Sequence, residues 1–361
     1  MAKVVKFGGS SLADANQFRK VAQIIRSDRK RRYVVPSAPG KRSPEDIKVT
    51  DMLYSCYDAV GLGRNATAEF LPIADRFDGI ISDLGLTISL DNEYEKITEN
   101  FKKRVGRDYA ASRGEYLNGI ILANYLGFQF VDAAKCVFFT ANGDFDPDLT
   151  DACLSSVLGG YSEAVIPGFY GAKPDGTIQT FSRGGSDFTG SVVAKAINAE
   201  MYENWTDVSG FLAADPHVVE NPEIIDYITY KELRELSYMG ASVLHQDAIF
   251  PVRAAGIPIN IRNTNAPGTM IVPEAPEGTE HKIITGIAGK KHFSVISIEK
   301  DEMNSEVGFL RRILTVLDNE GLGFEHIPTG IDTMSIVVST EELNSHPDTV
   351  RYISQITHAN H

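Results

Sequence analysis

The stretch Lys3-Val-Val-Lys-Phe-Gly-Gly-Ser-Ser11 places two glycines and two serines directly after a short apolar run. The β-branched run predicts a strand over residues 3–7. Apolar side chains at i, i+3, i+4 and i+7 from Phe18 to Ile25 predict a helix over residues 14–29. A glycine turn between a strand and a helix presents backbone N–H groups and the positive end of the helix dipole. The stretch therefore predicts an α/β fold with an anion-binding turn after its first strand.

The turn departs from two common phosphate-binding spacings, because it has neither G-x-x-x-x-G-K-[ST] nor G-x-G-x-x-G. Lys6 stands just before the glycines, where its charge could neutralise a phosphoryl group during transfer. The glycines would let the backbone approach that group closely. A tight strand–helix turn with a solvent-exposed lysine is the structural alternative.

The composition of the chain indicates which classes of binding partner to expect. The chain has 361 residues, enough for two domains, and 35 basic against 48 acidic residues give a formal net charge of −13. Nucleic acid and anionic membrane are excluded as expected partners, because phosphate-backbone binding needs clustered Lys and Arg. Cys56, Cys136 and Cys153 form no C-x-x-C pair, so neither a disulfide framework nor a zinc site is predicted. With no apolar signal-like segment at the start, we expect a cytoplasmic protein.

Strand-like and helical segments alternate over the first three quarters of the chain. The strand-like segments cover residues 33–36, 128–132, 137–140, 164–166, 199–204 and 258–262, and helical patterns lie up to residue 125 and over 187–198 and 231–238. Such alternation predicts a three-layer α/β sandwich with a mostly parallel central sheet. Prolines and glycines then interrupt residues 264–282, which predicts a linker.

A smaller unit follows the linker. The pattern predicts a strand over 292–298, a helix over 305–320, strands over 323–328 and 334–339, and a helix over 341–355. This β-α-β-β-α order is most of a ferredoxin-like α+β unit. We therefore expect a catalytic domain over residues 1–285, which ends in the linker, and a second unit over 286–361.

A second glycine pair repeats the design of the first. Gly184-Gly185 opens the helix predicted over 187–198, with Arg183, Ser186 and Asp187 around it. A guanidinium fork recognises carboxylates with two hydrogen bonds. Asp187 could instead be a capping or first-turn acid.

Two other polar stretches could serve a ligand. Glu115, near the start of a predicted helix, could receive an ammonium group, or it could be a solvated helix residue. Thr206-Asp207 follows a predicted strand and could bind a ribose or phosphate at the carboxyl edge of the sheet. A hairpin-like turn with capping hydroxyls is the alternative there.

Together these stretches resemble the amino-acid kinase superfamily and, within it, the aspartate kinase family. The resemblance covers nearly the whole chain and rests on Lys6-Phe-Gly-Gly-Ser-Ser11, Ser112-Arg-Gly-Glu115, Ser182-Arg-Gly-Gly-Ser-Asp-Phe-Thr189, Asn204-Trp-Thr-Asp-Val-Ser-Gly-Phe211 with Ala214-Asp-Pro216, and Gly240-Ala-Ser-Val-Leu-His245. Any one stretch is a weak signal, but five in the family's order are a strong one. The unit after the linker resembles the family's ACT regulatory region.

The resemblance implies transfer of the ATP γ-phosphate to the side-chain carboxylate of L-aspartate, the first step toward lysine, threonine and methionine. It assigns catalytic roles to Lys6 and Asp187. Binding roles are implied for Gly8, Gly9 and Ser10 around the phosphates, for Thr50, Glu115, Arg183 and Ser186 around aspartate, and for Thr206, Asp207, Phe211 and Asp215 around the nucleotide. The implied cofactors are ATP and Mg²⁺, with the metal carried by the nucleotide and water and with no metal-ligating residue.

Other functions remain open from the sequence. A kinase for a glutamate-type substrate and a non-catalytic amino-acid sensor are the alternatives, the second favoured slightly by Ser242, where many family members have lysine. The ACT-like unit lacks a fourth strand and a second copy of itself. We therefore expect a homodimer or higher homo-oligomer and weak inhibition by lysine or threonine as effector.

Overall fold

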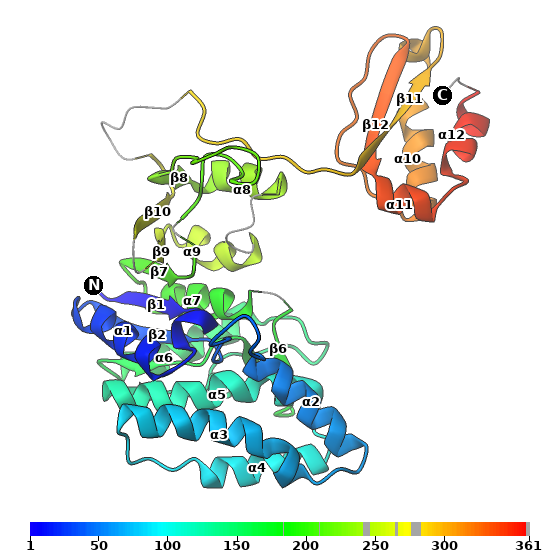
Figure 1. Cartoon of the computed structure of the whole chain (residues 1–361). Helices are drawn as coiled ribbons and strands as arrows, with labels where there is room; N and C mark the ends of the chain where they lie inside the picture. Colours follow the sequence, from blue (N-terminus) through cyan, green and yellow to red (C-terminus); the bar gives the residue numbers. More distant parts are fainter. Residues whose placement is uncertain (183, 209, 241–245, 264–265, 276–282, 359–361) are drawn as a thin grey trace. The chain divides into compact units, whose positions relative to one another are not determined.

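The computed structural model describes residues 1–182, 184–208, 210–240, 246–263, 266–275 and 283–358 (Figure 1). It divides into two compact units, Met1–Ala288 and Gly289–His361. This division lies close to the boundary expected after residue 285. None of the helices that the described residues form combines the length and the apolar composition needed to cross a bilayer.

The first unit is built on an eight-stranded sheet with the order β3-β4-β2-β1-β7-β9-β10-β8. The central strand β1 (Lys3–Phe7) lies between β2 (Arg31–Pro36) and β7 (Met201–Trp205) and is parallel to both. The other strands are β3 (Gln129–Phe130), β4 (Ala164–Val165), β8 (Tyr227–Thr229), β9 (Ile259–Asn263) and β10 (Ala266–Val272). Only β9 and β10 pair antiparallel among these described strands, so the carboxyl ends of β4, β2, β1, β7 and β9 share one edge.

Helices cover both faces of this sheet. Alternate side chains of β1 enter two separate cores, with Val5 and Phe7 in the first and Val4 in the second. The first core is completed by α1 (Ala15–Arg26), α2 (Val49–Gly61), α3 (Ala66–Leu84), α4 (Asp91–Lys102) and α5 (Arg107–Leu126). The second is completed by α6 (Pro147–Gly159), α7 (Gly185–Ala196), α8 (Tyr230–Tyr238) and α9 (Phe250–Ala254). The predicted three-layer sandwich with a mostly parallel sheet is thereby confirmed.

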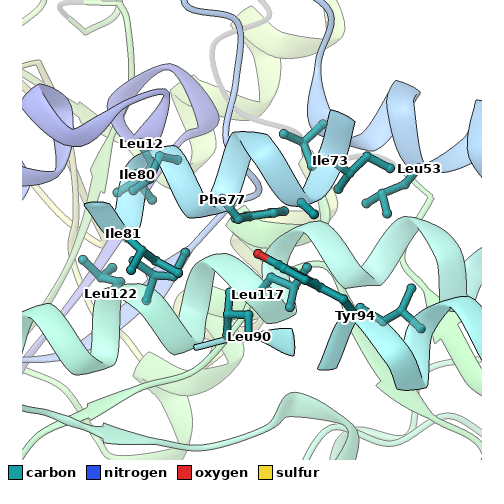
Figure 2. Packing of buried hydrophobic residues seen from close by; sticks show 14 of the residues in the cluster. Leu12, Leu53, Ile73, Phe77, Ile80, Ile81, Leu90, Tyr94, Leu117 and Leu122 are labelled. Carbon is teal, nitrogen blue, oxygen red and sulfur yellow. The ribbon is translucent and has the colours of Figure 1, made fainter. Parts of the chain in front are cut away.

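The first core extends well beyond the sheet, because α3 and α4 form a further layer that packs on α2 and α5. Figure 2 shows Ile73 and Phe77 of α3 close to Leu53 of α2, to Leu117 of α5 and to Tyr94 of α4. These side chains are buried. The packing fixes α2 and α5, which meet at Val49 and Gly114 beside the loop that follows β2.

Two local predictions in the first unit were wrong, and one hairpin was not predicted. Residues 137–140 make isolated bridges, Phe138 with Ala172 and Phe139 with Phe145, rather than a strand. An unpredicted hairpin of β5 (Tyr170–Ala172) and β6 (Ile178–Thr180) lies beside them. The predicted linker contains β10, which pairs with β9 through a register shift between Ala266 and Thr269. That irregularity accommodates the proline and glycine that made the segment look unstructured.

The second unit has one sheet packed on helices. In it β11 (Phe293–Glu299) pairs antiparallel with β12 (Thr333–Ser339). Helix α10 (Phe309–Glu320) lies between the two strands in the chain, and α11 (Thr340–Ser345) and α12 (Thr349–Thr357) follow β12. The strand predicted over 323–328 is reduced to a bridge between His326 and Val337. The helix predicted over 341–355 is broken at Pro347, which cannot continue a helix. Short 3₁₀ helices occur at Gly9–Leu12 (η1), Ala133–Lys135 (η2), Gln246–Ile249 (η3) and Met303–Ser305 (η4).

Candidate active site

Lys6 and Asp187 form an ion pair at the end of the central strand. The Lys6 Nζ lies 2.7 Å from Asp187 Oδ1, and its side chain is 9% exposed. Asn204 Nδ2 donates to the same Asp187 oxygen at 2.9 Å, because the register of β1 and β7 places Lys6 beside Asn204. The alternative of a solvent-exposed lysine is therefore wrong. Sequence reasoning missed Asn204, although strand register could have found it once β1 and β7 were paired.

The first glycine turn packs closely against the loop after β2. Gly40 N donates to Gly9 O at 2.8 Å, and a Cβ on Gly9 would lie 2.8 Å from Ala38 O. Gly8 N donates to Trp205 O at 3.1 Å, which ties the turn to β7. Glycine is needed at position 9 because any side chain would push the two loops apart. Ser10 is exposed at the start of the turn's 3₁₀ helix.

The same loop joins the turn to α5. A Cβ on Gly114 would lie 2.7 Å from the Ala38 Cβ, so the helix approaches the loop at this glycine. One turn further along α5, Asn118 Nδ2 donates to Ser37 O at 2.7 Å. Thr50, in the first turn of α2, is partly buried and follows Val49, which also borders Gly114. These contacts bring Thr50 and Glu115 to the loop that the glycine turn touches.

Glu115 is a buried carboxylic acid with an incomplete set of partners. Burial raises the pKa of the Glu115 carboxyl to about 8, against the opposing effects of the Ala38 and Glu115 backbone N–H groups and of the Arg113 charge. Its Oε2 atom has no hydrogen-bond partner. The alternative of a solvated glutamate is wrong, and the side chain is prepared to receive a donor.

The second glycine turn lies at the start of α7. Gly184 is the residue before the helix and adopts a left-handed conformation with φ +60°. Ser186 is buried, and a Cβ on Gly168 would lie 2.7 Å from the Ser186 Cβ. Gly168 N in turn donates to Pro36 O at 3.1 Å. The loops after β4 and β2 therefore meet the first turn of α7, while Arg183 lies outside the described residues.

The residues expected around the nucleotide separate into two groups. Ser10, Thr206 and Asp207 line a hollow of about 240 Å³ beside Trp205 and Lys20. Phe211 is instead buried at 1% exposure in the second core, so its side chain cannot line this hollow. Asp215 is exposed and accepts from His217 N at 2.8 Å, as a turn-capping acid does. Ser242 lies outside the described residues.

Arg76 of α3 is a second residue that sequence reasoning missed. Its Nη2 donates to Ala13 O at 2.9 Å and to Gly40 O at 2.8 Å, and its Nη1 lies 2.7 Å from Asp46. Hydrogen bonds from Arg42 and Arg76 hold the pKa of the Asp46 carboxyl well below its usual range. Arg76 thus fixes the loop at Gly40 on which the first glycine turn rests. A single arginine on an otherwise apolar helix face was the available signal.

The described residues at this edge offer few candidate ligands for a metal ion. Among the described residues no group of three or more His, Cys, Asp or Glu side chains could hold a metal ion. Asp187 Oδ1 is already engaged by Lys6 and Asn204. Mg²⁺ is commonly held by one or two carboxylates together with substrate phosphates. The residues at the site fit an ion that arrives with the nucleotide.

Comparison with known proteins agrees with this arrangement. The model of the amino acid kinase family matches residues 1–263. Aspartokinase 3 of Bacillus subtilis is 37% identical over 95% of this chain and 79% of its own length. The chain belongs to the amino acid kinase family, in its aspartokinase branch. The predicted resemblance is confirmed.

Other relatives of this amino acid kinase support the same assignment. Aspartokinase 1, chloroplastic, of Arabidopsis thaliana is 28% identical over 94% of this chain and 64% of its own length. The crystal structure of Clostridium acetobutylicum aspartate kinase is 50% identical with a TM-score of 0.90, covering 99% of this chain and 83% of that one. Escherichia coli aspartokinase III in complex with aspartate and ADP is 22% identical, has a TM-score of 0.72 over 99% of this chain and 84% of that one, and shares the fold.

Proposed function

We propose that this amino acid kinase transfers the γ-phosphoryl group of ATP to the side-chain carboxylate of L-aspartate, giving ADP and 4-phospho-L-aspartate. This is the first step toward lysine, threonine and methionine. The observation that carries the proposal is the pair of buried Lys6 and partly exposed Asp187 beside a glycine turn, with the incompletely partnered Glu115 across the adjoining loop. A cationic, glycine-lined turn suits a transferring phosphate, and a buried acceptor suits the amino group of the substrate.

The reaction needs positioning and charge neutralisation rather than a general base. The nucleophile is a carboxylate that is already ionised at pH 7. Lys6 would meet the negative charge on the phosphoryl group as it moves between the two oxygens. Asp187 Oδ1 holds the Lys6 ammonium, and Asn204 orients that carboxylate by donating a hydrogen bond to the same oxygen. Catalysis here would come from a preorganised cation rather than from proton transfer.

Aspartate would be held between α5, α7 and the first turn of α2. Glu115 would accept its α-ammonium group through the unpartnered Oε2. Ser186 at the start of α7 and Arg183 just before it would bind carboxylate, where the helix N-terminus also favours an anion. Thr50 would contact the substrate chain from α2. These roles are supported by the contacts among the loops and by the likeness to aspartokinases.

ATP would lie along the carboxyl edge of the sheet. Gly8, Gly9 and Ser10 would surround its phosphates, and Thr206 and Asp207 would contact the nucleotide from the end of β7. Phe211 and Asp215 do not line the hollow with Thr206 and Asp207. They would contribute to nucleotide binding through the chain segment to which they belong. Mg²⁺ would offset the charge of the β- and γ-phosphates, which would supply its main ligands.

The role of the second unit and the oligomeric state of the protein are also proposals. We propose that residues 1–285 are the catalytic domain and that the remainder is an ACT-like regulatory unit for an amino-acid effector such as lysine or threonine. A relative that is 26% identical over 96% of this chain is named lysine-sensitive aspartokinase 3. Exposed Val295 and Ile331 in the second unit favour a homodimer or higher homo-oligomer. The three free thiols are compatible with a cytoplasmic location.

The test is ATP-dependent formation of an acyl phosphate, trapped with hydroxylamine. We expect product with ATP and L-aspartate, little with L-glutamate, and none without ATP. A larger signal with L-glutamate would identify a different carboxylate kinase. Binding of an amino acid without any trapped product would identify a non-catalytic sensor and overturn the proposal.

A further inference from the structure

Helix α5 carries two buried acceptor atoms that lack hydrogen-bond partners. They are Glu115 Oε2 and Asn118 Oδ1. The two residues are three positions apart, so their side chains leave the same face of the helix. Both side chains are more than nine-tenths buried, with Glu115 6% exposed and Asn118 0% exposed. Buried polar atoms are usually completed by protein groups, by ordered water or by a ligand, so each one without a partner calls for an explanation.

The orientation of the Asn118 amide is set by its neighbour. Its Nδ2 donates to the Ser37 carbonyl oxygen at 2.7 Å. A carbonyl can only accept, so the nitrogen must occupy this position and the oxygen must point elsewhere. The contact therefore both fixes the side chain and leaves Oδ1 free to accept from another group.

Asn118 and Glu115 both interact with the loop that follows β2. Asn118 contacts Ser37, and the backbone N–H of Ala38 acts on the Glu115 carboxyl. That loop reaches the first glycine turn through Gly40 and Gly9. The two acceptors thus lie on the substrate side of the site rather than in an unrelated part of the core.

The group that would complete both atoms is a hydrogen-bond donor. Two acceptors one helical turn apart, one of them an acid, suit a primary ammonium, which has three N–H donors and no acceptor. A carboxylate or phosphate would place acceptor against acceptor. We propose that Asn118 recognises the substrate directly, its Oδ1 accepting a hydrogen bond from the α-ammonium of aspartate beside the Glu115 carboxylate. This inference rests on the proposed function and adds to it a residue that selects for the amino group.

The test compares L-aspartate with succinate, which has the same two carboxylates and no amino group. KM for L-aspartate and the competitive inhibition constant of succinate are measured for the wild-type chain, N118A and N118D. In N118A we expect KM to rise by about tenfold or more, as for loss of a hydrogen bond to a charged group. The succinate constant should change less than about twofold, and kcat should change little.

The second variant tests recognition in a chain that keeps the contact with the loop. As the protonated acid, N118D keeps an oxygen at the Oδ1 position and an O–H that can donate to the Ser37 carbonyl. It should therefore retain most of the preference for L-aspartate over succinate that N118A loses. N100A is the matched control, because Asn100 Nδ2 donates to the Tyr109 hydroxyl at 2.7 Å and so ties α4 to α5 outside the site. It should leave both constants near the wild-type values.

Each contrary result has a distinct meaning. Equal changes in KM and in the succinate constant for N118A would assign Asn118 to loop packing alone and overturn the proposal. If N118A does not fold, loss of the preference for L-aspartate in folded N118D would overturn it equally. A wild-type chain that forms no acyl phosphate with L-aspartate would remove the proposed function, and with it the ammonium that this inference requires.

Discussion

Two buried glutamates in the first unit have opposite surroundings. Glu203, on β7, is 0% exposed and lies 2.8 Å from Arg31 Nε and 3.3 Å from Lys3 Nζ, and Trp205 Nε1 donates to it at 3.0 Å. Glu115, on α5, is 6% exposed and has one oxygen without a partner. The protein therefore supplies Glu203 with a complete set of donors and leaves Glu115 short of one.

The difference teaches how to separate a structural charge from a functional one. A buried charge that is fully paired holds elements together, here β1, β2 and β7 through Lys3, Arg31 and Glu203. A buried acid that lacks a partner is costly unless a ligand completes it. Burial alone does not distinguish the two glutamates, whereas the number of donors around each carboxylate does.

The largest expected effect comes from breaking the complete cluster. Glu203→Leu would leave the buried Arg31 guanidinium without its carboxylate, and should cost about 3–5 kcal/mol of unfolding free energy. Urea unfolding followed by circular dichroism measures this loss. Glu200→Leu is the control, since it removes the surface pairs with Lys30 and with the Met1 ammonium and should cost less than about 1 kcal/mol. Similar losses in both variants would contradict the comparison.

Lys6→Met should act on catalysis more than on stability. We expect kcat to fall by at least about 100-fold, or roughly 2.7–4 kcal/mol of transition-state stabilisation. Stability should fall much less than in Glu203→Leu, because Asp187 is partly exposed and keeps Asn204 as a donor. Lys102→Met, at an exposed position of α4, is the control and should keep wild-type activity. A Lys6→Met enzyme that keeps more than roughly a tenth of kcat would show that the pair with Asp187 is structural.

Glu115→Gln should separate binding from folding. The amide keeps the shape of the side chain but cannot ionise when the substrate ammonium binds, so KM for L-aspartate should rise about 10- to 100-fold. KM for ATP should change little. Stability should stay equal or increase, because a neutral group replaces a buried acid. Destabilisation as large as that of Glu203→Leu would mean that Glu115 is a structural residue as well.

The smallest expected effect is a dependence of stability on pH. Because burial raises the pKa of the Glu115 carboxyl to about 8, the folded chain holds a proton there that the unfolded chain has already lost at pH 7. The free energy of unfolding should therefore fall as pH rises, by about 1 kcal/mol more in the wild type than in Glu115→Gln between pH 7 and pH 8. Parallel pH curves for the two proteins would place the pKa of Glu115 near its ordinary value.

Much of the fold could be predicted from local patterns. The strand at Lys3–Phe7, the helices that follow it and the glycine turns depend on hydrophobic period and turn chemistry, which a short window of sequence contains. The order of the glycine and acidic stretches likewise indicated the family. The prediction failed where a distant strand overrode local composition, as at β10, or where one proline divided a helix, as at Pro347.

The sequence by itself determined which chemical groups the site has, since Lys6, Glu115, Ser186 and Asp187 could be named without a structure. Only the tertiary structure decided how they are used. Strand register places Asn204 beside Lys6, close packing places Gly40 on Gly9, and the Ser37 carbonyl turns the Asn118 oxygen away from its loop. The tertiary structure also places Phe211 in the second core. The physical reason is that register, close packing and hydrogen-bond partners join residues far apart in the chain, and no local pattern records them.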